Sequence, residues 1–191
     1  MAGRQLDVLV ICGSLRKGSY NAALARTLPA LAPAGLSLRS APSFANFPIY
    51  NADIQTASGF PPEVNAWADA IRSADALIIV SPEYNWSIPG GLKNAIDWVS
   101  RMQNQPFKDK PVAFQSAAGG ILGGSRAQYH LRQSLTSVDV ILFGRPEVIV
   151  TFAAQKFDDK TLELRDQTAL DLIRQQLAAF DIFVRRVTAK D

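Results

Sequence analysis

The sequence LDVLVICGSLRKGSYN, residues 6–21, decides the fold class of this chain. Its first seven residues form a short run that is apolar on both faces, as in strands of a parallel sheet covered by helices. Glycine and small polar residues follow, and from Asn21 a helical pattern places Leu24, Leu28 and Leu31 on one stripe. A buried strand that turns through small residues into a helix is typical of an α/β protein.

The same alternation of apolar runs and helical patterns continues along the chain. Further strands are predicted at residues 76–80, 111–115 and 138–143, with a weaker one at 36–39. Helices are predicted at residues 21–31, 62–74, 91–100, 125–137 and 168–187. Five strands and five helices in alternation predict a doubly wound α/β sandwich. Because no linker, repeat or low-complexity tract divides the sequence, residues 1–191 are expected to form a single domain.

The composition excludes several classes of protein. The net charge of +3 comes without a run of basic residues, so no nucleic-acid partner is expected. The single cysteine, Cys12, allows no internal disulfide, and with His130 as the only histidine a Cys/His metal site cannot be built. We interpret Cys12 as a small buried residue at a strand end. No signal peptide and no run of about 18 apolar residues is present, so no membrane partner and a cytoplasmic location are expected.

Three loops are candidates for the ligand site, because the ligand of a doubly wound sheet lies beyond the carboxyl ends of its strands. The first loop, residues 13–21, combines small residues, short polar side chains, a helix start and Arg16, all of which suit an oxyanion. It is not a P-loop, because Ser19 and Tyr20 stand where Lys and Ser or Thr are required, and no GxGxxG motif is present. The arginine of a cysteine phosphatase loop is missing too, since Gly18 takes its place. An ordinary capped strand-to-helix turn is the alternative interpretation.

The second and third loops suit a flat ring. Residues 81–91 contain two prolines and two glycines that fix the path of the chain, with two aromatic residues and Asn85 between them. This composition fits a heteroaromatic ring held by backbone groups and covered on its face. Glu83 is not expected to act as a general acid, because no second carboxylate or histidine accompanies it. Residues 116–124 carry four glycines, so either a ligand approaches the main chain there or the loop moves.

At these residues the chain resembles the NADPH-dependent FMN reductase family, particularly its bacterial chromate and quinone reductase branch. The matching pieces are GSLRKGSYN at 13–21, PEYN at 82–85, GGLKNAIDW at 90–98 and GGSRAQYHLRQ at 123–133. The resemblance covers nearly the whole chain. It implies a flavodoxin-like three-layer α/β sandwich with a five-stranded parallel sheet in the strand order 2-1-3-4-5.

The resemblance also implies FMN as the cofactor, with contacts from all three loops. The phosphate is expected at residues of the first loop, namely Ser14, Arg16, Lys17, Gly18, Ser19, Tyr20 and Asn21. The isoalloxazine ring and ribityl chain are expected at Pro82, Glu83, Tyr84 and Asn85, largely through backbone groups. From the third loop Ser116, Ala118 and Gly119 are expected to approach the ring, with fewer hydroxyl groups than relatives carry there.

A homodimer or homotetramer is a further expectation. The family is typically dimeric or tetrameric, and Arg126, Tyr129 and Glu147 match positions of inter-subunit contacts in the close branch. In addition, the apolar residues of 90–101 are not confined to one stripe. Such a surface needs a second cover, either another subunit or the tail of the chain itself.

The implied activity is that of an NAD(P)H-dependent reductase in which FMN carries the chemistry and no side chain is catalytic. NADPH or NADH is expected to reduce the flavin, leave, and be replaced by a quinone, chromate or free flavin in a ping-pong cycle. Basic residues near the pocket would favour the anionic nucleotide and chromate. The alternatives are a flavodoxin-type one-electron carrier acting with a protein partner, and a phosphate-ligand binding module without turnover. Carriers of the first kind are usually strongly acidic, unlike this chain.

Overall fold

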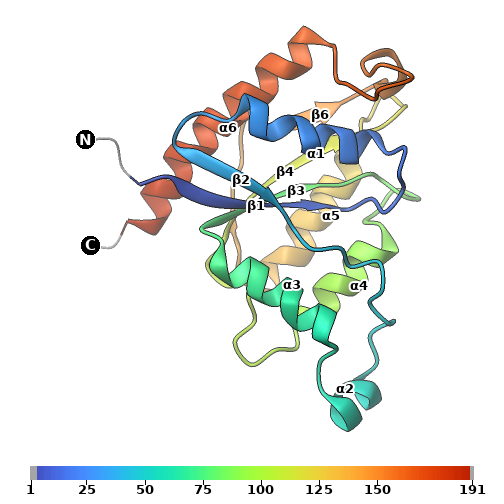
Figure 1. The fold of residues 1–191 in the computed structure, drawn as a ribbon, viewed down its shortest axis with the longest axis vertical. Helices are drawn as coiled ribbons and strands as arrows, with labels where there is room; N and C mark the ends of the chain where they lie inside the picture. The colour runs from blue at the N-terminus through green and yellow to red at the C-terminus, as the bar shows by residue number, and fades with distance from the viewer. Residues whose placement is uncertain (1–3, 190–191) are drawn as a thin grey trace.

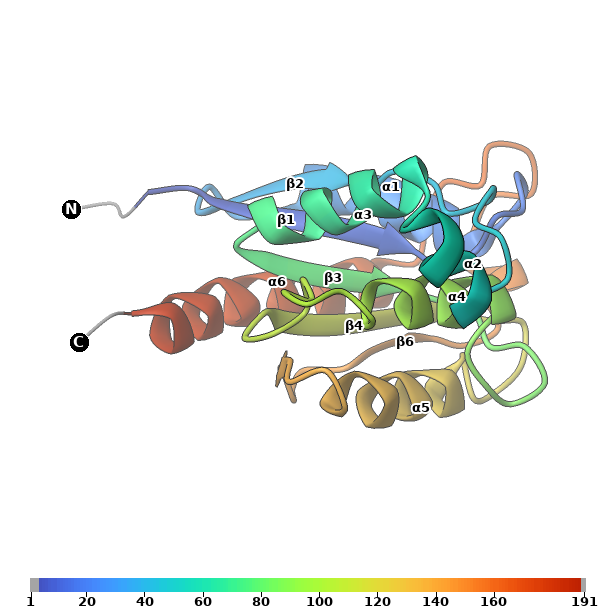
Figure 2. The same cartoon turned by 90° about the horizontal axis from the view of Figure 1, so that it is seen from below.

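The computed structural model describes residues 4–189 and shows a central parallel sheet between two layers of helices (Figures 1 and 2). The sheet contains β1 (Leu6–Cys12), β2 (Leu36–Ser40), β3 (Ala76–Val80), β4 (Pro111–Ala117), β5 (Ile141–Leu142) and β6 (Val148–Val150). Its order is β2-β1-β3-β4-β5, and β6 also pairs with β4. The flavodoxin-like strand order predicted from the sequence is therefore confirmed.

The register of the central strands brings the three candidate loops to one edge of the sheet. Cys12, the last residue of β1, lies opposite Val80, the last residue of β3. Val80 in turn lies opposite Gln115 of β4. All three strands run in the same direction, so the loops that follow them start side by side.

The outer position of the sheet differs from the prediction of one strand at 138–143. Residues 138–140 are not in a strand, and Asp139 has a φ of 56°, in the left-handed region. Two short strands take the place of the fifth one: β5 pairs with the start of β4, and β6 pairs with its end. In the irregular segment between β5 and β6, two carbonyl oxygens accept hydrogen bonds from side chains and not from a neighbouring strand. Arg132 donates to the Phe143 carbonyl, and Gln176 donates to the Pro146 carbonyl.

The helices agree closely with their predicted ranges, apart from one that the sequence pattern did not reveal. They are α1 (Tyr20–Leu31), α3 (Pro62–Ser73), α4 (Gly90–Val99), α5 (Ser125–Thr136) and α6 (Gln167–Thr188), with a short 3-10 turn, η1 (Ala153–Gln155). The additional helix is α2 (Ala52–Ser58), which has no buried residue and hence no apolar stripe to signal it. Its limits are set locally, by the Asn51 side chain bonding Asp53 N at 2.8 Å and by Gly59 with a φ of 74°.

Two hydrophobic cores lie on opposite faces of the sheet. The α1 and α6 helices pack on one face, and α3, α4 and α5 pack on the other (Figure 1). Alternate residues of β1 serve each core: Val8 and Val10 face the first, and Leu9 and Ile11 face the second. None of the helices within residues 4–189 is long and apolar enough to cross a membrane.

The apolar residues of 90–101 are covered by the same chain, which corrects the expectation that another subunit or the tail covers them. Leu92, Ile96 and Trp98 are buried in the second core. Trp98 donates from Nε1 to the Pro48 carbonyl at 2.8 Å, and the Tyr50 ring lies edge-on at 5.1 Å between centroids. The cover therefore comes from the segment that follows β2.

Candidate functional site

The first loop forms a capped helix start with free cations beside it. The Ser19 hydroxyl accepts hydrogen bonds from Asn21 N at 3.2 Å and Ala22 N at 3.3 Å, so it caps α1. Arg16 and Lys17 are exposed, and neither makes an ion pair with any residue in the range 4–189. Ser14 is largely buried, and its hydroxyl accepts from Arg16 N at 3.4 Å. The loop thus presents two unpaired cations next to a helix N-terminus, which suits a phosphate.

The Asn21 side chain forms hydrogen bonds within the protein that the sequence did not predict. Its Nδ2 donates to the Ala117 carbonyl at 2.8 Å, and its Oδ1 accepts from Ala117 N at 2.9 Å. The side chain is buried and ties the start of α1 to the end of β4. Tyr20, its neighbour, packs against Phe157 with the ring centroids 5.2 Å apart. Both side chains thus have partners within the protein.

The second loop is a tight hairpin. Tyr84 and Ser87 exchange two backbone hydrogen bonds of 3.1 and 3.0 Å, and the two residues between them have positive φ: 48° for Asn85 and 66° for Trp86. This is the pattern of a type I′ turn. Pro82 is buried, whereas Tyr84 and Trp86 are exposed to 48% and 67%. The hairpin therefore holds two aromatic side chains outward at the carboxyl edge of the sheet.

The third loop divides into a tight half and an open half. A side-chain carbon at Gly123 or Gly124 would lie 2.5 Å from Ile149 or 2.8 Å from Ser116, so only glycine fits there. At Gly119 and Gly120, by contrast, no atom beyond the neighbouring residues in the chain lies within 4 Å of that position. The open half is free to receive a ligand at close range.

Ser116 lies in the interior, although it was predicted as a cofactor contact. Its side chain is fully buried, and its hydroxyl accepts from Gln128 Nε2 at 2.8 Å. Ala118, two residues further on, is partly exposed and bonds Val150 through its backbone N–H. Of the three residues predicted in this loop, Ala118 and Gly119 therefore face the open side.

A cavity of about 270 Å³ lies between the second and third loops. It is lined by Glu83, Ala118, Gly120, Ile121, Leu122, Gly123, Gly124 and Arg126. Sequence reasoning missed Gly120, Ile121 and Leu122, and it placed Arg126 at a subunit contact. The one available signal was position, since all four belong to the glycine-rich loop or to the helix turn that follows it.

The site fits FMN. Unpaired cations and a helix start in the first loop suit the phosphate, and the cavity and the open glycines suit a flat ring nearby. Glu83 does not stand free in this cavity: its side chain is 13% exposed, and its carboxylate accepts from Ala127 N at 3.3 Å and lies 3.7 Å from the Arg126 guanidinium. Its carboxylate is thus occupied as an acceptor.

Cys12 lies next to a separate small cavity of about 170 Å³ between the first loop and residues 40–44. Its thiol is partly buried and contacts the Ser14 carbonyl at 3.5 Å. Burial raises the pKa of the Cys12 thiol above its ordinary value, because it disfavours the thiolate. Burial thus disfavours the thiolate, the form in which a cysteine reacts as a nucleophile.

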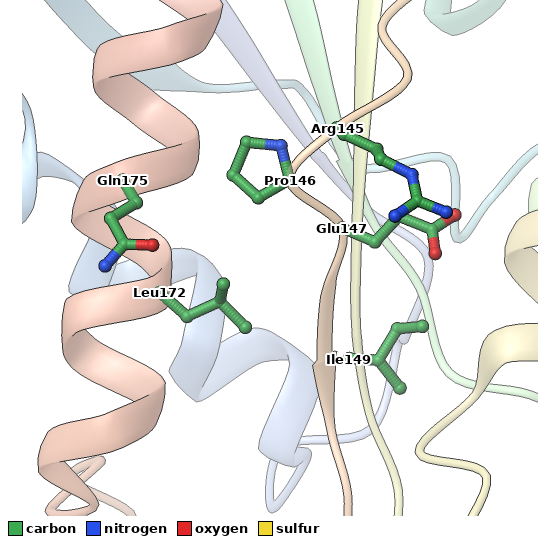
Figure 3. A pocket seen from close by; sticks show the side chains of 6 residues that line it. All are labelled: Arg145, Pro146, Glu147, Ile149, Leu172 and Gln175. Atoms are coloured by element: carbon green, nitrogen blue, oxygen red, sulfur yellow. The ribbon is translucent and has the colours of Figure 1, made fainter.

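A further cavity, about 750 Å³, lies between β6 and α6. Figure 3 shows its lining, which comprises Arg145, Pro146, Glu147, Ile149, Leu172 and Gln175. None of the predicted flavin contacts is among these residues. Glu147, a predicted subunit contact, pairs with Arg132 of the same chain at 3.4 Å.

Comparisons with known proteins agree with this geometry. The sequence pattern of NADPH-dependent FMN reductases matches residues 6–155. The chain is 49% identical over 183 residues to a quinone reductase of Escherichia coli strain K12, covering 96% of this chain and 97% of that one. It is 47% identical over 182 residues to an NAD(P)H-dependent FMN reductase of Pseudomonas aeruginosa, covering 95% of this chain and 97% of that one.

A solved structure is similar as well. The flavoenzyme NAD(P)H:(acceptor) oxidoreductase FerB of Paracoccus denitrificans aligns with a TM-score of 0.83 at 31% identity, covering 95% of this chain and 98% of that one. The likeness therefore extends over sequence and fold together. The chain belongs to the NADPH-dependent FMN reductase family, an assignment that indicates FMN as cofactor and NAD(P)H as electron donor.

Proposed function

We propose that this FMN-dependent NAD(P)H oxidoreductase reduces quinones, and also chromate, in a ping-pong cycle. The observation that carries the proposal is the open cavity between the second and third loops at the carboxyl edge of the sheet, in a sequence without a second nucleotide-binding motif. Donor and acceptor would alternate there. The relatives named for quinone reduction support quinones as the acceptor class.

The residues of the chain bind and orient the cofactor in this proposal. When bound, FMN supplies the hydride and electron transfer chemistry. Arg16 and Lys17, with the N–H groups at the start of α1, would hold the phosphate. Backbone groups of residues 82–85 and of Ala118 and Gly119 would contact the ring. The exposed cations would also draw in anionic nucleotides and chromate.

Steady-state kinetics test the cycle. NADPH and NADH are each varied at several fixed concentrations of a quinone, and then of chromate. Parallel lines in double-reciprocal plots are expected for both acceptors. Intersecting lines would show a ternary complex and contradict alternation at one site.

The flavodoxin-type one-electron carrier is the second candidate function, and the net charge of +3 disfavours it. One measurement distinguishes the reductase from the one-electron carrier. The purified flavin-loaded protein is expected to bleach anaerobically with NADPH alone. A carrier would need a protein partner, so it would stay yellow.

An assembly of two or four copies, and a cytoplasmic location, are part of the proposal. Arg126, Tyr129 and Glu147 are the candidate contacts. Arg126 and Glu147 already have partners within the chain, whereas Tyr129 is 58% exposed. Sedimentation at micromolar concentration is expected to show no stable monomer, and Tyr129→Ala to weaken the assembly. A wild-type monomer would contradict the assembly.

A further inference from the structure

The helix α5 begins without a cap of its own. Its N-cap residue is Gly124, which has a φ of 94° and no side chain, and no acidic residue lies in its first turn. The N–H groups at a helix start need acceptors, and the helix dipole favours a carboxylate there. The acceptor comes from the second loop, 44 residues earlier in the chain, because Oε2 of Glu83 accepts from Ala127 N at 3.3 Å.

Three further contacts join this helix to the second loop. The Arg126 guanidinium lies over the ring of Trp86, with its Cζ 4.1 Å from the ring centroid, and its Nη1 lies 3.7 Å from Oε1 of Glu83. One turn further along, Nδ1 of His130 is 2.9 Å from the Ser87 hydroxyl. Residues 126 and 130 are four apart and so lie on one face of the helix. That face contacts both the start and the end of the hairpin.

The hairpin needs such support. Asn85 and Trp86 both lie in the left-handed region, which costs free energy for residues other than glycine. Type I′ turns usually carry Asn-Gly, and here a bulky, exposed tryptophan occupies the position of the glycine. Stacking on Arg126 gives that side chain a fixed partner.

We infer that Glu83 is a positioning residue for the flavin, acting through α5 and the hairpin. Its partly buried carboxylate connects the start of α5 to residues 82–87 and so sets the backbone of the hairpin against the cavity that Gly120 and Arg126 also line. Arg126 contributes by pairing with this carboxylate and holding Trp86. The inference rests on the proposed function, because that function assigns the hairpin to the flavin.

Two substitutions at one position test the inference. Glu83→Gln keeps an oxygen that can accept from Ala127 N, whereas Glu83→Ala removes it. FMN dissociation constants are measured by quenching of flavin fluorescence. Glu83→Ala is expected to weaken FMN binding about five- to tenfold, the size typical of a lost helix cap. Glu83→Gln is expected to retain most of the affinity.

Arg126→Ala and Arg174→Ala form a matched pair of variants. Both arginines are partly exposed and pair with a carboxylate, but Arg174 and Asp171 lie on α6, away from the loops. Arg126→Ala is expected to weaken FMN binding, and Arg174→Ala to leave it unchanged. Because neither variant removes the Glu83 carboxylate, this pair carries the test even where Glu83→Ala does not fold.

Thermal unfolding of the apoprotein separates positioning from simple capping. A residue that merely caps α5 would lower the melting temperature of Glu83→Ala while leaving the FMN affinity of the folded protein unchanged. That outcome overturns the inference, and so does an FMN affinity in Glu83→Gln as weak as in Glu83→Ala. Equal FMN affinity in Arg126→Ala and Arg174→Ala overturns it too. Failure of the proposed function would give a different result, namely that NADPH does not reduce the flavin bound to the wild-type protein.

Discussion

Individual residues of the site divide into those with partners inside the protein and those left free. The polar atoms of Asn21 and Glu83 form hydrogen bonds with backbone groups of neighbouring elements. Arg16 and Lys17 face outward without an ion pair in the described part of the chain. Because a polar group satisfied inside the protein has little left to offer a ligand, the free cations are the stronger candidates for recognising phosphate.

Arg16→Ala is expected to weaken FMN far more than riboflavin, which lacks the phosphate. A charge-assisted hydrogen bond contributes about 1.5–3 kcal/mol, so the loss in FMN affinity is about 10- to 100-fold. Titration of both flavins at low and high salt measures it, with reduction by NADPH at saturating FMN expected to change little. Equal losses for FMN and riboflavin would mean that Arg16 supports the loop instead of the phosphate.

Cys12 is expected to react slowly with thiol reagents at pH 7. Burial raises the pKa of its thiol, and the thiolate is the reactive form. Labelling of the native protein should therefore be slower than that of a small free thiol and should accelerate as the pH rises. The protein unfolded in urea provides the control. Native labelling as fast as that control would contradict the expected environment.

At the scale of elements, α1 is joined to β4 by one side chain. Asn21→Ala would leave the Ala117 N–H and carbonyl without their partner in a buried place. The free energy of unfolding is expected to fall by about 1–3 kcal/mol, as measured by urea denaturation. Asn51→Ala, which removes an exposed cap from α2, is the control and should cost less. Similar losses in both variants would argue against the joining role.

The start of β1 and the start of β3 are joined by an ion pair that depends on pH. Bonding to Arg4 lowers the pKa of Asp75, which also accepts from Asp7 N at 2.8 Å. A lowered folded-state pKa gives stability that is present above the unfolded pKa and is lost as the pH falls through the folded one. Asp75→Asn should therefore destabilise the protein at pH 7 and progressively less below about pH 4.

Urea unfolding across this pH range measures the dependence. Asp69→Asn is the comparison, because the pair of Asp69 and Arg72 is an exposed contact within α3. Its effect should be small at every pH. A difference between wild type and Asp75→Asn that stays constant with pH would exclude the proposed linkage.

The whole molecule consists of two cores that share one sheet, and this predicts cooperative unfolding. Trp67 and Trp98 lie in the core under α3, α4 and α5, whereas α1 and α6 pack on the other face. Tryptophan fluorescence and far-ultraviolet circular dichroism are therefore expected to show the same midpoint and one transition. Separate midpoints would mean that the two faces unfold independently and that residues 1–191 are not a single domain.

The central strands, the long helices and the three loops followed from sequence patterns, whereas the order of the strands followed from the resemblance to the FMN reductase family. Apolar runs and helical stripes are local patterns, and parallel strands must end at one edge, so the position of the site could be predicted as well. Short elements without a buried stripe could not be predicted this way. For that reason α2 was missed, and the outer strand was placed too early in the chain.

Only the tertiary structure decided which polar side chains stay free for a ligand. Asn21 and Ser116 are polar residues of the kind that bind ligands. Instead, the Asn21 side chain bonds the backbone of Ala117, which is 96 residues away in the sequence, and the Ser116 hydroxyl accepts from Gln128. Glu83 likewise caps a helix 44 residues further on. A sequence fixes which groups can form hydrogen bonds, whereas their partners depend on which elements the packed sheet brings together.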